Sequence, residues 1–166
     1  MPNPETGLIE DPLLGLRVIV IDTEFYKGLR SKLYSKFDSG ASIILYEMGV
    51  GYGETMAKNI QEMGAGKLEV YRKFIKKGKL QGYGEFGVPL LESLITGMKR
   101  EAKVYVNSNF FSHAAGQTGK TECWIIAGII AGAAKIIYGR EMVCVEEKCV
   151  SKGDLRCEFH LKPQFQ

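Results

Sequence analysis

A long hydrophobic run, a strong excess of charge and a basic leader are all missing from this sequence of 166 residues. Its longest apolar stretch, Trp124 to Ala134, is interrupted by glycines and is far shorter than the roughly 20 residues that cross a bilayer. Met1 to Gly7 contains two prolines and resembles neither a secretion signal nor a membrane anchor, so we expect a cytoplasmic protein without membrane insertion. A formal net charge of +3 is too small to indicate nucleic acid as a direct partner.

Residues that catalysis commonly uses are also scarce. The two histidines are His113 and His160, and no serine stands in a nucleophile elbow, so the pattern does not favour a catalytic triad. Gly49, Gly51 and Gly53 lack the spacing of a dinucleotide fingerprint, and no strand leads directly into them. We therefore expect no catalytic residues in this chain.

A relaxed phosphate-loop pattern occurs in the segment AAGQTGKT, residues 114 to 121, just before a predicted helix. Such a loop would hold phosphates through backbone amides, the Lys120 side chain and the Thr121 hydroxyl. It also requires a buried parallel sheet, which the order of the predicted elements does not indicate. We prefer an exposed loop in which Thr121 caps the following helix.

The hydrophobic pattern predicts an α+β fold, with an antiparallel sheet of about four to five strands packed against helices. Residues 1–10 are expected to form a flexible segment and residues 11–166 a single domain. Predicted helices cover 23–37, with Asp22 or Thr23 as the cap, and then 41–63, 67–77 and 122–138. Predicted strands cover 17–22, 81–94, 102–108, 141–150 and 155–161, with a turn near 97–100.

Glycines recur inside two of these helices. Gly49, Gly51 and Gly53 each cost a helix about 1 kcal/mol relative to alanine, a cost that is usually offset by close approach of another backbone. Gly128 and Gly132 stand four residues apart on one face of the last helix. We therefore predict close helix packing at these positions.

All four cysteines lie near the carboxyl end of the chain, at Cys123, Cys144, Cys149 and Cys157. In a reducing compartment such a cluster favours metal binding or chemistry over a disulfide. Three thiolates and one glutamate would suit zinc at tetrahedral geometry, and four protein ligands would make the site structural. The alternative is that the cysteines are small buried apolar residues, and spacing alone leaves the two interpretations balanced.

Two glutamates compete for the fourth place around such a metal. In a regular strand Glu147 shares a face with Cys149, because side chains alternate. Glu146 would share that face only if a bulge shifted the register. The residues by themselves leave this choice open.

The segment ECWIIAGIIAGAAKIIYGREMVCVEEKCVSKGDLRCEF resembles the closing signature of the 4-vinyl reductase domain family. The resemblance extends upstream to SIILYEMGVGYGE and KVYVNSNFF, and so covers roughly residues 16 to 161. In sensor domains of this family the zinc ligands are a cysteine, a glutamate 23 positions on, a cysteine three later and another eight later. Here Cys123, Glu146, Cys149 and Cys157 stand at those intervals. The resemblance thus implies structural zinc held by these four residues, with Cys144 outside the site in the core.

The family also suggests what the chain does. Its members include sensor domains of aromatic-responsive transcription activators and proteins tied to tetrapyrrole biosynthesis, and subunits of a vesicle-tethering complex share the fold. The resemblance implies a zinc-stabilised domain that binds a small hydrophobic or aromatic ligand as a homodimer and acts through a separate output protein. The alternatives are an enzyme or accessory factor in tetrapyrrole vinyl-group reduction, and a dimeric scaffold for protein interactions.

A ligand pocket is expected between the helices and the sheet. Aromatic side chains near the sheet and the cysteine helix are available to line it. These candidates are Phe86, Tyr105, Phe110, Phe111 and Trp124. Each of them would serve equally well as an ordinary core residue.

Overall fold

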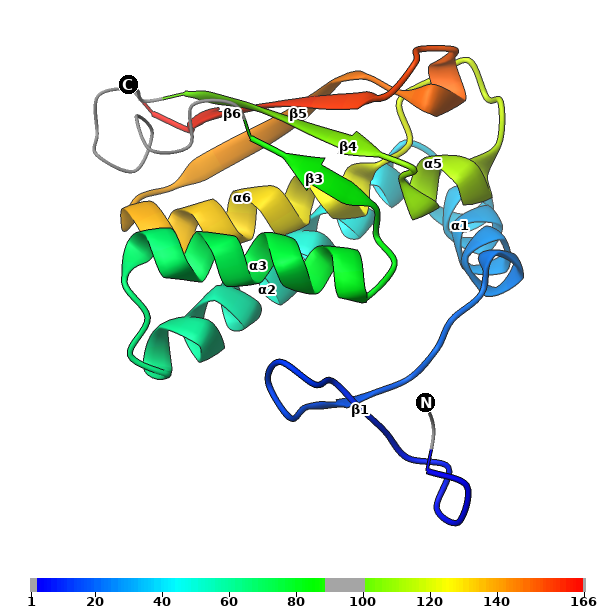
Figure 1. Ribbon diagram of the computed structural model, residues 1–166. Helices are drawn as coiled ribbons and strands as arrows, with labels where there is room; N and C mark the ends of the chain where they lie inside the picture. The colour runs from blue at the N-terminus through cyan, green and yellow to red at the C-terminus, as the bar shows by residue number, and fades with distance from the viewer. Residues whose placement is uncertain (1–2, 89–100, 166) are drawn as a thin grey trace.

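A four-stranded antiparallel sheet forms one layer of the protein, and helices cover one of its faces (Figure 1). The computed structural model describes residues 3–88 and 101–165. The strands are β3 (Glu85–Gly87), β4 (Ala102–Asn107), β5 (Met142–Lys148) and β6 (Cys157–Pro163), in the order β3-β4-β6-β5. The predicted α+β class is confirmed.

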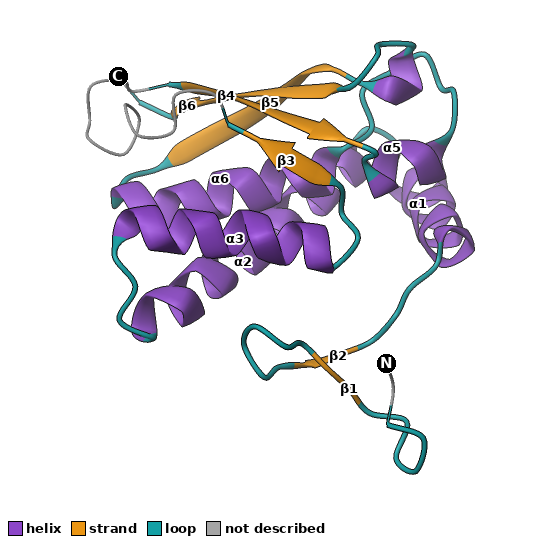
Figure 2. Ribbon diagram, viewed as in Figure 1, coloured by secondary structure: helices purple, strands orange, loops and turns teal. Residues whose placement is uncertain are grey.

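The helix α6 (Trp124–Tyr138) lies directly against the sheet (Figure 2). Most of its residues are buried. It ends as predicted at Gly139, whose φ of 67° gives the left-handed turn that glycine adopts without strain. Its N-cap is Cys123, so the prediction that Thr121 caps this helix is wrong. Ile126 of this helix belongs to the same buried core cluster as Val104 and Phe159 of the sheet.

The helix α2 (Gly40–Glu62) lies beyond α6, and α3 (Lys67–Leu80) lies beside α6 and also contacts β3. The helix α1 (Thr23–Phe37) and the short α5 (Phe110–Ala115) lie at one end (Figure 1). The Asp22 carboxylate accepts a hydrogen bond from the amide of Phe25 at 2.8 Å, which confirms Asp22 as the cap of α1. The helix α3 continues past the expected end near Gly78, and α5 was not predicted.

Glycines bring α2 and α6 into backbone contact. A Cβ atom on Gly53 would overlap the carbonyl oxygen of Ile129, and one on Gly132 would overlap that of Val50. Gly49 and Gly128 make equivalent close approaches, so the predicted packing is confirmed at four glycines. Gly51 has open space around its Cα, so the prediction is wrong at that position.

The amino-terminal segment forms a separate small hairpin of β1 (Ile9–Glu10) and β2 (Arg17–Val18). In Figure 1 it lies on the side of the helices away from the large sheet. The predicted strand 17–22 therefore shrinks to two residues and joins no central sheet. Ile19 and Val20 are 80% and 79% exposed, because no partner strand or helix covers them in the described structure.

Two further expectations are changed by the structure. Within the described part of the predicted strand 81–94, residues 81–88, the three residues of β3 form a strand. Positions 89–94 and the turn near 97–100 lie outside the described residues. The two closing strands are connected through a short 3-10 helix, η1 (Val150–Lys152). Among the described helices, none combines the length and apolarity needed to span a membrane.

Candidate metal centre and ligand cavities

Three cysteines and one glutamate converge where α6 begins and β5 turns into β6. Cys123 is the N-cap of α6, Glu146 lies in β5, Cys149 precedes η1, and Cys157 opens β6. All four side chains are buried, and one possible ligand atom from each lies within 4.8 Å of the others. Cys144, the remaining cysteine, is buried elsewhere in the core.

The distances between the sulfurs fit a tetrahedral ion. Cys123 Sγ lies 3.8 Å from Cys149 Sγ and 3.7 Å from Cys157 Sγ, and the Cys149–Cys157 distance is 4.0 Å. A zinc–sulfur bond of about 2.3 Å places two tetrahedral sulfur ligands about 3.8 Å apart. A disulfide would require about 2.05 Å between the sulfurs, so the three thiols are free.

An irregularity in β5 brings Glu146 and Cys149 to the same side of the strand. Glu146 faces inward by regular alternation with Met142 and Cys144, and the register shift between Glu146 and Lys148 lets Cys149 join it in the cluster. Glu147 instead points outward, where its carboxylate lies 2.6 Å from Lys103 Nζ. Glu146 was expected to share a face with Cys149 only if a bulge shifted the register. That shift is present, so Glu146 joins the cysteine cluster and Glu147 does not.

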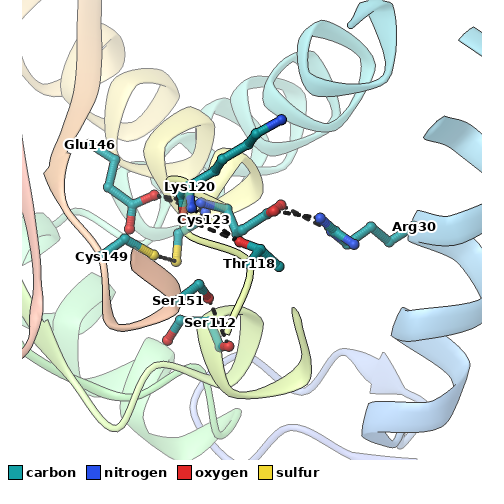
Figure 3. Close-up of polar contacts among 9 residues, drawn as sticks. Arg30, Ser112, Thr118, Lys120, Cys123, Glu146, Cys149 and Ser151 are labelled. Carbon is teal, nitrogen blue, oxygen red and sulfur yellow. Dashed lines mark hydrogen bonds and ion pairs between the residues drawn. The ribbon is translucent and has the colours of Figure 1, made fainter. Parts of the chain in front are cut away.

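The two oxygens of Glu146 have different surroundings (Figure 3). Oε2 accepts hydrogen bonds from the backbone amides of Glu122 at 3.1 Å and Cys123 at 2.9 Å. Oε1 is buried and has no hydrogen-bond partner within the described structure. A buried carboxylate oxygen without a partner is costly, and a cation among the three sulfurs would satisfy it.

Burial and mutual contacts shift the ionisation of these groups. Burial raises the pKa of the Glu146 carboxyl to about 8. Hydrogen bonding to the sulfurs of Cys149 and Cys157 raises the pKa of the Cys123 thiol, and burial raises it further. Contacts with the sulfurs of Cys123 and Cys149 lower the pKa of Cys157 to about 4. Without a cation, protons therefore occupy Glu146 and Cys123 near neutral pH, and a metal would replace them.

Hydrogen bonds around the cluster hold the loops that carry it. The amide of Cys149 donates to Asp154 Oδ2 at 2.9 Å. Figure 3 shows a second contact, in which the Ser151 hydroxyl donates to the carbonyl of Ser112 at 3.0 Å. The amides of Thr118 and Gly119 both donate to the carbonyl of Ser151. These two amides belong to the phosphate-loop pattern, and here they bind η1. No parallel sheet exists among the described strands, so this loop has none of the setting of a nucleotide site.

One ion pair that no sequence pattern indicates fixes the start of α6. The guanidinium of Arg30 on α1 makes a two-pronged contact with the Glu122 carboxylate, with one nitrogen–oxygen distance of 3.0 Å. The Glu122 side chain is 3% exposed. Because the partners are 92 positions apart, no local pattern could have revealed the pair.

Two apolar cavities lie between α3, α6 and the sheet. Phe74 and Phe86 line both of them. The cavities are small, with volumes of about 10 Å³ and about 20 Å³, so each has room for about one water. An aromatic ring would enter only if lining side chains moved.

The five aromatic residues expected to line a pocket are not gathered around one cavity. Phe86 lines both apolar cavities. Phe110 and Phe111 pack with Tyr26 in an aromatic cluster, and Tyr105 lies under the Arg156 guanidinium at 4.4 Å. Trp124 borders a separate open groove at the start of α6. Sequence reasoning missed Phe74, because on a helical pattern it is indistinguishable from other core residues.

Comparisons with known proteins agree with this geometry. A family model for the 4-vinyl reductase domain matches residues 103–163, a range that includes all four residues of the buried cluster. An uncharacterized protein of Methanocaldococcus jannaschii is 29% identical over 124 residues. That match covers 74% of this chain and 65% of the relative, so the chain spans slightly less than two thirds of it.

Three solved structures share the fold. The phenol-responsive sensory domain of the transcription activator PoxR, solved with phenol, has a TM-score of 0.80 at 18% identity, covering 96% of this chain and 87% of that one. A vinyl-4-reductase family protein of Methanocaldococcus jannaschii has a TM-score of 0.65 at 23% identity, and the match covers 88% of this chain and 83% of that one. The third structure is a trafficking protein particle complex subunit 3 of Naegleria fowleri, covalently bound to palmitic acid. It has a TM-score of 0.60 at 15% identity, and the match covers 86% of this chain and 92% of that one.

Proposed function

The chain carries a 4-vinyl reductase domain, and on that premise we propose that it is a zinc-stabilised binding domain for a small hydrophobic or aromatic molecule, with no catalysis of its own. Cys123, Glu146, Cys149 and Cys157 would hold the zinc. The observation that carries the metal proposal is the buried Glu146 Oε1, which lacks a partner beside three sulfurs at tetrahedral spacing. With four protein ligands the ion has no open position, so its role is structural.

The ligand proposal is supported by the two apolar cavities. They lie in the hydrophobic interior on either side of Phe86, where a ligand would be removed from water. Structures with this fold hold phenol in one protein and palmitic acid in another. Movement of Phe86 and Phe74 would join the two spaces and make room for a ring or a short chain. Binding would thus be coupled to side-chain rearrangement.

We also propose that the domain acts as a homodimer in a reducing, cytoplasmic compartment and passes its signal to a separate partner. Large apolar side chains are exposed on α1 and α2: Phe25 is 59% exposed, Phe37 55%, Ile43 65% and Met48 51%. A second copy of the chain would cover such a surface. Sedimentation analysis should give a dimer mass that falls to the monomer mass in Ile43→Glu. A monomeric wild type would contradict this part of the proposal.

Metal analysis tests the first part. Protein purified without added zinc should contain one zinc per chain, and Cys157→Ser should lose it together with several kcal/mol of stability, because metal binding is coupled to folding. Cys144→Ser is the matched control, since Cys144 is also buried but lies outside the cluster. Equal zinc contents in the two variants would contradict the assignment.

Ligand binding is tested by calorimetry with phenol and 2-naphthol. Phe86→Ala should favour the larger ring, because it joins the two cavities, whereas Phe110→Ala should leave the ratio of affinities unchanged. The nearly filled cavities also favour one alternative, a scaffold that binds proteins and no small molecule. Absence of binding by both phenols and by aliphatic ligands of similar size would support the scaffold.

A further inference from the structure

Lys77 is a buried lysine in the wall of the first apolar cavity. It lies near the end of α3, and its side chain is 2% exposed. Among the described residues that line this cavity it is the one that carries a formal charge. Lysine is rarely buried to this extent unless it is paired, so its partner determines what the cavity can accept.

The partner comes from outside the helical layer. Asp11, in the loop of the amino-terminal hairpin, places its Oδ2 atom 2.7 Å from Lys77 Nζ and is itself 4% exposed. Its Oδ1 atom accepts hydrogen bonds from the amides of Leu13 and Leu14 at 3.0 and 2.9 Å. One carboxylate thus holds the hairpin loop together and attaches it to the cavity wall.

The contacts of Asp11 favour its charged form. Burial by itself would raise the pKa of Asp11, but the hydrogen bond from Lys77 and those from the loop amides lower it below its usual value. Removing Asp11 without a replacement would leave a buried ammonium group unpaired, which is strongly unfavourable. Only an incoming anion could take the place of Asp11 and keep Lys77 paired.

Besides Lys77, three residues with polar groups line the cavity, namely Tyr52, Gln81 and Tyr83. The Tyr52 hydroxyl already donates to Gln81 Oε1 at 2.8 Å. Past them the lining becomes apolar, with Phe74 and Phe86 leading toward the second cavity. A molecule bound here would meet a positive charge at one end and aromatic side chains at the other.

We propose that the ligand of this domain is an apolar carboxylate whose charged group replaces Asp11 at Lys77 while its apolar part passes Phe86. This inference rests on the proposed function, because it assumes that the cavity binds a ligand. Exchanging one carboxylate for another keeps the buried ammonium paired and frees the hairpin loop. The Asp11–Lys77 pair is therefore both the selectivity element for the ligand and the contact that ligand binding breaks.

Matched ligand pairs test the selectivity by calorimetry. Benzoate is compared with benzyl alcohol and octanoate with 1-octanol, which separates an aromatic ligand from an aliphatic one. Asp11→Asn keeps the loop hydrogen bonds but removes the competing charge, so it should bind the carboxylates about tenfold or more tightly, with the alcohols unchanged. Lys77→Met should abolish the preference for carboxylates. Lys76→Met, at the exposed neighbouring position, should behave as wild type.

Hydrogen exchange gives a second measurement on the wild type. The amides of Asp11 and of residues 13–16 should exchange faster when a carboxylate is bound and at an unchanged rate with the matching alcohol. If Lys77→Met does not fold, the double variant Asp11→Leu/Lys77→Met removes both charges, and the loss of carboxylate preference is measured there.

The outcomes separate this inference from the function on which it rests. Alcohols that bind as tightly as carboxylates in both wild type and Asp11→Asn would overturn the role of Lys77 while leaving ligand binding intact. Failure of all four ligands to bind any variant would overturn both. A carboxylate preference that survives in Lys77→Met or in the double variant would place the anion elsewhere and refute the inference.

Discussion

The Oε2 atom of Glu146 lies 2.9 Å from the backbone nitrogen of Cys123, so the carboxylate of one candidate metal ligand holds the main chain of another. Amides at the start of a helix have no partner within the helix, and a carboxylate there is also favoured by the helix dipole. Glu146 therefore holds the backbone of Cys123, the N-cap residue of α6, near the position where Thr121 was expected to act. The same side chain would connect the helix, the strand and the ion.

Replacing Glu146 by glutamine tests this double role. The amide oxygen of Glu146→Gln can still accept from the Cys123 backbone, but the negative charge is lost. We expect zinc affinity to fall by at least about 10- to 100-fold while the helical content is retained. Competition with a chromophoric chelator measures the affinity, and circular dichroism the helix.

Glu147→Gln is the matched control for this substitution. Glu147 is the adjacent residue but pairs with Lys103 at the surface. Its replacement should leave zinc affinity within about twofold of wild type, because an exposed ion pair contributes little. If the two variants lost zinc equally, the bulge in β5 would not be selecting the ligand.

Zinc binding should depend on pH in a defined direction. Burial raises the pKa of Glu146 to about 8, so below that pH a proton must leave the carboxyl before it can bind a cation. Apparent zinc affinity should therefore rise as the pH increases from 6 to 8. In Glu146→Gln zinc binding should release about one proton fewer, so the slope of log affinity against pH should be smaller by about one. Identical slopes in the two proteins would show that Glu146 does not compete with a proton for the metal.

The glycine contacts between α2 and α6 predict opposite effects at two positions of one helix. Gly53→Ala forces a Cβ atom against the backbone of Ile129 and should cost about 1–3 kcal/mol or more of unfolding free energy. Gly51→Ala meets nothing within 4 Å and should stabilise the protein by up to about 1 kcal/mol through helix propensity. Urea denaturation measures both. If both substitutions changed the free energy of unfolding in the same direction, the described packing of α2 on α6 would be contradicted.

The Arg30–Glu122 pair should contribute strongly because it is largely buried. Arg30→Ala leaves the Glu122 carboxylate without a counter-charge at 3% exposure, and we expect a loss of about 3–5 kcal/mol. Lys27→Ala breaks an exposed pair with Glu24 on the same helix and should cost less than about 0.5 kcal/mol. Thermal unfolding compares the two. Comparable losses would mean that burial of the Arg30 pair adds nothing.

Helices were easier to predict from this sequence than edge strands. The apolar period and the Asp22 and Gly139 end signals locate α1 and α6 almost to the residue. The segment 17–22 is rich in β-branched residues, but a strand also needs a partner, and Ile19 and Val20 have none in the described structure. Strand propensity reports side-chain type, whereas pairing depends on distant parts of the chain.

The candidate metal site was partly accessible from the sequence. Cysteine positions indicated a cluster, but alternation along β5 pointed to Glu147, because a bulge cannot be read from side-chain period alone. The resemblance to a family selected Glu146, and the geometry explains why. The Asp11–Lys77 and Arg30–Glu122 pairs join residues 66 and 92 positions apart, so nothing in their local surroundings could predict them.

The contact between α2 and α6 has a mechanical consequence. Where backbone meets backbone at four glycines, no long side chain lies between the two helices to absorb a displacement. A small rotation of α6 at its cysteine end would therefore move the backbone of α2 with it. Because α2 carries exposed Ile43 and Met48, such a rotation would reorient this exposed apolar surface.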